Sequence, residues 1–146
     1  MRRRTLLAAA AALSVLRIAA AWPQDDKEYE AKLQRQAKAL PAIRAAIVAA
    51  AGYDEANVEV TPAPHRLVVR LVNSKRAESN NAALIEEANL ISSAVAQEIA
   101  TRPDFNEIEM LHVDYIMRDP DGRAVATVQA VDFRRDSEGK FRHQAS

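Results

Sequence analysis

A long β-hairpin is the most strongly specified element in this sequence. Two stretches rich in β-branched and aromatic residues, 107–118 and 123–134, flank the sequence Asp-Pro-Asp-Gly at 119–122. Aspartate, proline and glycine are common in turns, and their order at 119–122 suits a four-residue hairpin loop. The sequence therefore predicts two antiparallel strands whose register is set by this turn.

The predicted register places His112 opposite Gln129 and Asp114 opposite Thr127. Because side chains alternate across a sheet, one face of the hairpin would then be apolar, with small residues opposite large ones. Small residues let a helix approach closely, so this face is expected to form the core beneath the helices. Its members are Leu111, Val113, Tyr115, Met117, Ala124, Ala126, Val128 and Ala130.

The opposite face of the hairpin is the candidate interaction site. It has a polar centre bordered by apolar residues, a combination typical of surfaces that bind another protein or a second copy of the chain. A solvated face, or a third layer formed by the C-terminal segment, is the alternative. The residues of the predicted interaction face are Ile108, Met110, His112, Asp114, Thr127, Gln129, Val131 and Phe133.

Two amphipathic helices are predicted by apolar residues that recur every three or four positions. The first covers about 26–51, with a stripe of Tyr29, Leu33, Ala37, Leu40, Ile43 and Ile47, and Gly52 supplies its C-terminal stop. Pro41 is expected to kink this helix or to divide it in two. The second carries a stripe of Leu84, Ala88, Ile91, Val95 and Ile99, with Ser79 as its expected N-cap.

Short alternating stretches around 58–60 and 67–71 predict two further strands, with prolines at their turn. The predicted fold class is α+β, with two helices on one face of a mostly antiparallel four-stranded sheet in the order αββαββ. The predicted organisation is a single domain over 22–136, followed by a polar C-terminal tail over 137–146.

Residues 1–21 have the composition of a cleavable export signal. Arg2, Arg3 and Arg4 precede an uncharged run over 5–16, which is shorter than the roughly 20 residues needed to cross a bilayer. Small residues at 19–21 predict cleavage after Ala21. An uncleaved anchor or a buried helix is the alternative. The arginines partly resemble a twin-arginine signal, which leaves the export route open. We expect a periplasmic or secreted protein with no stable membrane anchor after cleavage.

Cleavage would change the charge balance. The signal contains four of the 20 basic residues and none of the 20 acidic ones, so 20 − 4 = 16 basic residues would remain against 20 acidic ones. This excess of acidic residues argues against nucleic acid as a partner, since its binding needs clustered Lys and Arg. The chain has no cysteine, which excludes disulfides and thiol catalysis.

Catalytic, metal-binding and cofactor motifs are absent from the sequence. It lacks GxSxG, HExxH and EF-hand patterns, and its three glycines do not form a phosphate-binding loop. His112 and Asp114 point the same way on a strand and could form a metal or catalytic pair, but they have no evident third member. We therefore expect a non-enzymatic interaction or envelope accessory module without cofactors. The alternative is a carrier that holds a small apolar or amphipathic ligand between helices and sheet.

Overall fold

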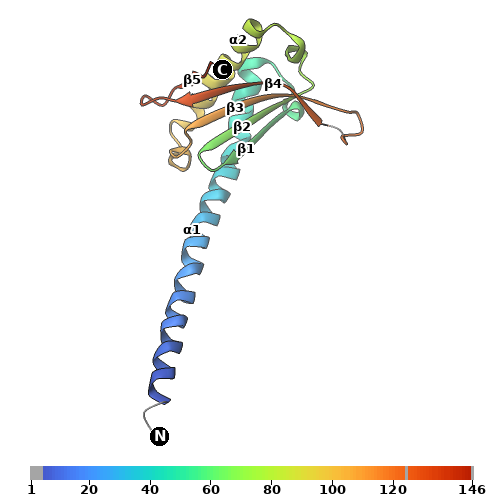
Figure 1. Ribbon diagram of the computed structural model, residues 1–146. Coiled ribbons are helices and arrows are strands. Elements are labelled where there is room, and N and C mark those ends of the chain that lie inside the picture. The colour runs from blue at the N-terminus through green and yellow to red at the C-terminus, as the bar shows by residue number, and fades with distance from the viewer. Residues whose placement is uncertain (1–4, 124, 146) are drawn as a thin grey trace. The chain divides into compact units, whose positions relative to one another are not determined.

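The computed structural model describes the backbone of residues 5–123 and 125–145, and the side chains of this part from Asp25 onward (Figure 1). Residues 1–4 and the side chains before Asp25 lie outside the described part, so the export signal and its cleavage after Ala21 stay predictions. The chain divides into two compact units, of which the first ends at Ala37 and the second begins at Lys38. In the described part, no helix is both long and apolar enough to cross a membrane.

The first helix, α1 (Thr5–Ala51), is continuous and so contributes to both units. It ends where the sequence predicts. Gly52 adopts a φ of 75°, and its N–H donates a hydrogen bond to the carbonyl of Val48 at 2.8 Å. Pro41 neither ends nor divides the helix. The helix lacks one hydrogen bond here, because Pro41 has no N–H to donate to the carbonyl of Ala37. Ala37 is also the last residue of the first unit.

Only the second half of the predicted apolar stripe of α1 is buried. Ile43 and Ile47 are fully buried in the core, whereas Tyr29 and Leu33 keep 55% and 40% of their surfaces exposed. The predicted stripe therefore enters the core at Ile43 and Ile47, which belong to the second unit. Apolar periodicity identifies a face that can pack, but it does not place a partner beside that face.

In the described part of the chain, five strands form one mixed sheet, and the second helix and three short 3-10 helices lie in the connections. The strands are β1 (Val58–Ala63), β2 (Arg66–Val72), β3 (Met110–Arg118), β4 (Val125–Arg135) and β5 (Phe141–His143). The helices are α2 (Asn81–Ile99), η1 (Glu55–Asn57), η2 (Lys75–Glu78) and η3 (Pro103–Phe105). The spatial order is β1-β2-β3-β4-β5, with β2 and β3 parallel and the other neighbours antiparallel. The α+β class is confirmed, whereas the four-stranded antiparallel sheet and the αββαββ order are wrong.

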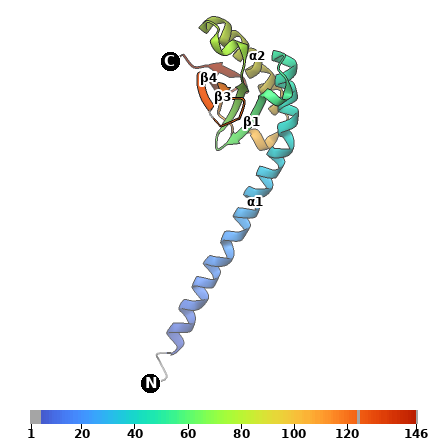
Figure 2. The same ribbon diagram turned by 90° about the vertical axis from the view of Figure 1, so that its right-hand side faces the viewer.

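Helix α2 explains the parallel pair. The chain leaves β2, passes through α2 and enters β3 in the same direction, a crossover that requires a dozen or more residues. The helix begins after Asn80, whose side chain accepts a hydrogen bond from the N–H of Ala83 at 2.9 Å, one residue beyond the predicted cap Ser79. Its predicted stripe is confirmed, since all five members are buried. Figure 2 shows α2 and the last turns of α1 on the same side of the sheet.

The fifth strand lies in the segment that the sequence predicts to be a tail. Asp136 organises the turn before it, because its Oδ1 accepts the N–H groups of Glu138 and Lys140, each at 2.9 Å. A hydrogen bond from Arg142 is the main cause that lowers the pKa of Asp136. Phe141 then packs at the border of the core with 8% of its surface exposed. One apolar residue in a polar segment was too weak a pattern to predict this strand.

The register of β3 against β4 also differs from the predicted one. His112 faces Asp132 and Asp114 faces Ala130, because the connecting loop covers all of 119–124 and a bulge follows Tyr115. Beyond the bulge each partner is displaced by three residues from its predicted position. An odd displacement exchanges the two faces of a strand.

The exchange of faces changes which residues of β4 enter the core. Leu111, Val113 and Tyr115 are fully buried as predicted, but their partners on β4 are Phe133, Val131 and Gln129. Of the residues that the sequence predicts to lie under the helices, Ala130 is exposed because of this exchange. Ala126 still shares a face with Met117, since the register before the bulge is displaced by two residues, and Val128 is the unpaired residue of the bulge. These three residues are exposed as well, and Ala124 is outside the described residues.

Candidate functional site

The structure does not assemble the predicted interaction face as one surface. Ile108, Val131 and Phe133 lie in the hydrophobic core, with 2%, 4% and 0% of their surfaces exposed. Gln129 turns toward η2, where its side-chain amide donates to the carbonyls of Ala77 and Ser79 at 2.7 and 3.3 Å. These four members of the predicted face are therefore separated from the rest by the sheet itself.

The remaining members, Met110, His112, Asp114 and Thr127, share the outer face of the sheet, on the side away from the core. His112 Nδ1 lies 2.6 Å from Asp132 Oδ1. The hydroxyl of Thr127 donates to Asp114 Oδ2 at 3.3 Å. His112 and Asp114 thus bond to different neighbours, and no group of three or more potential metal ligands occurs among the described residues.

A polar cluster that the sequence did not predict joins α2 to the sheet. Glu87 Oε1 accepts hydrogen bonds from the hydroxyls of Tyr53 and Tyr115 at 2.5 and 3.1 Å, and its Oε2 lies 3.4 Å from Arg76 Nε. Burial is the main cause that raises the pKa of both tyrosines above the ordinary range, and the Glu87 carboxylate adds to it. A cavity of about 450 Å³ lies beside this cluster, lined among others by Tyr53, Ser74 and Glu87. Its lining is mainly polar.

The most unusual feature of the surface is the open edge of β4, defined as residues 125–130. The second half of β4 is paired on both sides, since β5 pairs with residues 133–135 and Gln144 donates its N–H to the carbonyl of Asp132 at 2.8 Å. Residues 125–127, 129 and 130 pair with β3 on one side, and Val128 is the unpaired residue of the bulge. In the part of the chain that is described, no strand pairs with this stretch on the other side. All residues of the stretch except Gln129 are exposed, and none is charged.

The backbone of Ala130 shows what this edge offers. In an antiparallel strand, successive residues turn their N–H and C=O groups to alternate sides. Asp132 turns its carbonyl toward the β5 side, and Arg135 donates in the opposite direction, to the carbonyl of Glu109 at 2.7 Å. Ala130 has the same parity as Asp132, so its N–H and C=O point outward from the open edge. An extended peptide is the partner that can bond to such groups in sequence.

A cavity of about 210 Å³ adjoins the end of the open edge. Asn81 and Ile85 of α2 line one side, Ala130 and Asp132 of β4 line another, and Gln144 closes the end beyond β5. A segment that continued the sheet beside β4 would reach this cavity, which could accept one of its side chains.

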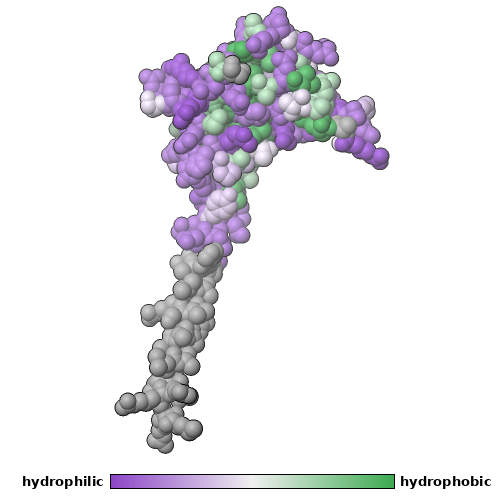
Figure 3. All heavy atoms as spheres, viewed as in Figure 1, coloured by the Kyte–Doolittle hydropathy of each residue, from purple (hydrophilic) through white to green (hydrophobic). Residues whose placement is uncertain are grey.

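Apolar side chains accompany the open edge. Met117, Val125 and Val128 keep 41%, 54% and 43% of their surfaces exposed. Figure 3 shows hydrophobic residues near the base of the β3–β4 hairpin and hydrophilic residues at its tip. A strand added here would therefore gain apolar contact as well as backbone hydrogen bonds.

Comparison with known proteins yields no relative: no family model, curated protein or solved structure matches the chain. The site must therefore be argued from its geometry alone.

One sequence signal could have identified the open edge. Residues 125–130 form an uncharged stretch of high β-propensity that contains neither proline nor glycine. The predicted register assigns Ala126, Val128 and Ala130 to the core, and so the sequence does not identify this stretch as an exposed edge.

Proposed function

We propose that the chain is an exported, non-enzymatic interaction module that binds an extended segment of a partner protein along the open edge of β4. The observation that carries the proposal is the run of uncharged residues at 125–130, all exposed except Gln129, whose outward edge pairs with no strand of the described part. Natural proteins usually protect such edges with charges, proline or a covering element. Apart from the bulge at Val128, the described residues give 125–130 none of this protection, and such an edge is suited to strand addition.

The size of the edge is compatible with a short linear motif. A segment that paired with all of 125–130 would extend over about 20 Å, at roughly 3.4 Å per residue. Backbone bonds would supply affinity, while the cavity beside Ala130 and the exposed Val125 and Val128 would select side chains. We therefore expect a partner segment that is extended, free of proline and partly apolar.

The packing between α2 and the sheet favours an interaction module over a carrier of an apolar ligand. Ile91, Val95 and Val113 are completely buried between α2 and the sheet. The cavity of about 450 Å³ is lined by groups such as Tyr53, Ser74 and Glu87, which suit a polar occupant. An apolar ligand prefers a concave, mostly apolar site.

The export part of the proposal rests on Arg2–Arg4, the uncharged run that follows and the small residues before Trp22. Expression of the full chain in a bacterium, followed by N-terminal sequencing of the periplasmic or secreted fraction, tests it. We expect Trp22 as the first residue. A protein that is retained in the cytoplasm and begins at Met1 would contradict export.

Ala130→Pro tests strand addition, with Ala130→Ser as the matched control. Proline removes the outward N–H at this position but no hydrogen bond to β3, whereas serine keeps the N–H. Random peptides of about ten residues, displayed on phage, are selected on the wild-type protein. We expect binding to Ala130→Ser to stay within about threefold and binding to Ala130→Pro to fall at least about tenfold, or about 1.4 kcal/mol.

Circular dichroism and thermal melting verify that both variants are folded, and sedimentation of each protein alone tests for self-association. A dimer that Ala130→Pro abolishes would identify a second copy as the partner and support the proposal. Selected peptides that bind all three proteins equally, or a selection that yields no binder together with a monomer at all concentrations, would overturn it.

A further inference from the structure

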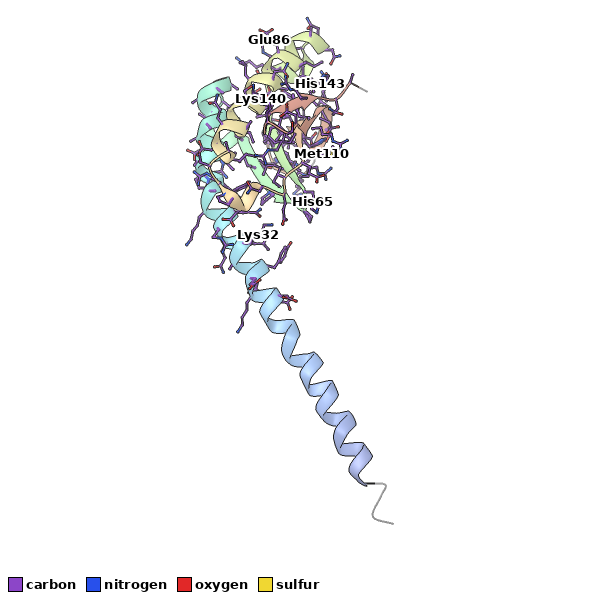
Figure 4. All side chains as sticks on the ribbon, turned by 90° about the vertical axis from the view of Figure 1, so that its left-hand side faces the viewer. Lys32, His65, Glu86, Met110, Lys140 and His143 are labelled. Atoms are coloured by element: carbon purple, nitrogen blue, oxygen red, sulfur yellow. The ribbon has the colours of Figure 1, made fainter. Side chains whose placement is uncertain are left out.

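The outer face of the sheet carries a row of arginines at the end nearest β5. The registers align Arg66 of β2, Met110 of β3, Arg134 of β4 and Arg142 of β5 as direct neighbours across four strands. All four are exposed. Since neighbouring strands lie about 4.8 Å apart, this arginine row spans about 14 Å. Figure 4 shows Met110 on the side of the sheet away from α2.

The charges elsewhere on this face are largely balanced. Arg118 Nη2 lies 2.8 Å from Glu59 Oε1, and Arg70 Nε lies 3.9 Å from Asp114 Oδ2. His112 pairs with Asp132. The outer face beyond the arginine row thus offers little net charge to a partner.

The arginine row itself is poorly compensated. Arg142 Nε pairs with Asp136 Oδ2 at 2.9 Å. Arg66 and Arg134 have no ion pair with any residue of the described part. Arg134 and Arg142 stand directly opposite each other, an arrangement of like charges that destabilises a pair of strands. An external anion would relieve this repulsion.

We propose that the arginine row binds anionic phospholipid headgroups at a membrane surface. Guanidinium groups form paired, charge-assisted hydrogen bonds with phosphate oxygens. The row lies on an open sheet face, which allows several headgroups to bind at once. Met110, with 39% of its surface exposed at the centre of the row, adds an apolar side chain that a lipid surface can accommodate and a free phosphate ion does not use.

The expected strength is that of a reversible contact. Each arginine close to an anionic membrane contributes about 1 kcal/mol, so the two arginines without an ion pair, Arg66 and Arg134, would raise partitioning by about 30-fold relative to neutral lipid. Outside the arginine row the chain has more acidic than basic residues, which favours an approach of the folded domain by this face. Screening by salt would weaken the contact, because the groups are exposed.

A fluorescent label at Met110→Cys tests the proposal on the full chain, which has no cysteine of its own. A polarity-sensitive dye at this position reports contact with lipid at the arginine row, separately from any contact made by the N-terminal segment. The matched control is a dye at Glu86→Cys, an exposed position on α2 (Figure 4). Vesicles of phosphatidylcholine alone are compared with vesicles that also contain phosphatidylglycerol.

We expect a blue shift at position 110, but not at position 86, with the vesicles that contain phosphatidylglycerol. The substitutions Arg66→Gln and Arg134→Gln together should weaken this response about 30-fold, which corresponds to two arginines. Inorganic phosphate at the same concentration should not reproduce the shift. An equal shift with neutral vesicles, an unchanged response of the folded double variant, a shift caused by phosphate or duplex DNA alone, or no shift at all would overturn the proposal.

Discussion

The two halves of β4 belong to one strand but meet different surroundings. Residues 131–135 are paired with β3 and continue beside β5, and they bury Val131 and Phe133. Within the described part of the chain, the first half, 125–130, pairs with β3 alone except at the bulge residue Val128, and it exposes Val125 and Val128. The division shows that strand propensity alone does not say whether a strand edge is closed. Closure depends on whether another segment returns to that edge, as β5 does here.

The other edge of the sheet, formed by β1, is protected against pairing with another chain. β1 also lies at an edge, but it carries the charge of Glu59 and contains Pro62, and Pro64 follows it. Charge and proline both discourage the pairing of another chain. Residues 125–130 of β4 have neither feature. The two edges therefore differ in protection, and strand addition is expected at β4 only.

The largest expected difference between the halves is in stability. Phe133→Ala removes a fully buried side chain and should lower the free energy of unfolding by about 3–5 kcal/mol. Val128→Ala, on the open edge, should change it by less than about 0.5 kcal/mol. Urea unfolding followed by circular dichroism measures both. Equal losses would mean that the register of β4 described above is incorrect.

Hydrogen exchange should separate the two halves at the level of single amides. The N–H of Arg135 is bonded to the carbonyl of Glu109 at 2.7 Å, whereas the N–H of Ala130 points out of the open edge. We expect Ala130 to exchange faster by on the order of 100-fold, since local protection follows hydrogen bonding and burial. Exchange measured by NMR on the protein at low concentration provides the comparison. Similar protection of both amides would indicate that the edge is already covered.

The pH dependence of stability probes the boundary between the halves, where Tyr115 faces Gln129. Burial and Glu87 raise the pKa of Tyr115 in the folded state, so its stabilising effect is complete below pH 10 and is lost as pH rises above 10. Between about pH 8 and about pH 11, the wild type should lose about 1.4 kcal/mol more than Tyr115→Phe. Urea unfolding at the two pH values measures the free energy of unfolding of both proteins. If both lost the same amount, the pKa of Tyr115 would not be raised.

The smallest expected effect concerns the attachment of β4 to η2. Gln129→Ala removes two hydrogen bonds to the carbonyls of Ala77 and Ser79, and should cost about 1 kcal/mol. Gln97→Ala, an exposed glutamine on α2, is the control and should change stability very little. Thermal melting compares the two. Equal effects would show that Gln129 does not hold η2 against the sheet.

Sequence patterns predicted the elements better than their arrangement. The stripe of α2, the glycine stop of α1 and the strand pairs on either side of each turn follow from local periodicity and turn chemistry, and the structure confirms them. The stripe around Tyr29 and Leu33 was misleading, because burial also requires a partner in space. The candidate site was missed for a related reason, since a displacement of three residues moved Phe133 into the core and Ala130 out of it.

Local chemistry was thus sufficient to predict α2, the β3–β4 hairpin and the uncharged character of residues 125–130. The tertiary structure decided that β3 runs parallel to β2, that Phe141 returns to pair beside β4, and that the pairing ends before Ala130. These outcomes depend on contacts between residues far apart in the chain. A bulge and a longer loop change such contacts without leaving a clear pattern in the sequence.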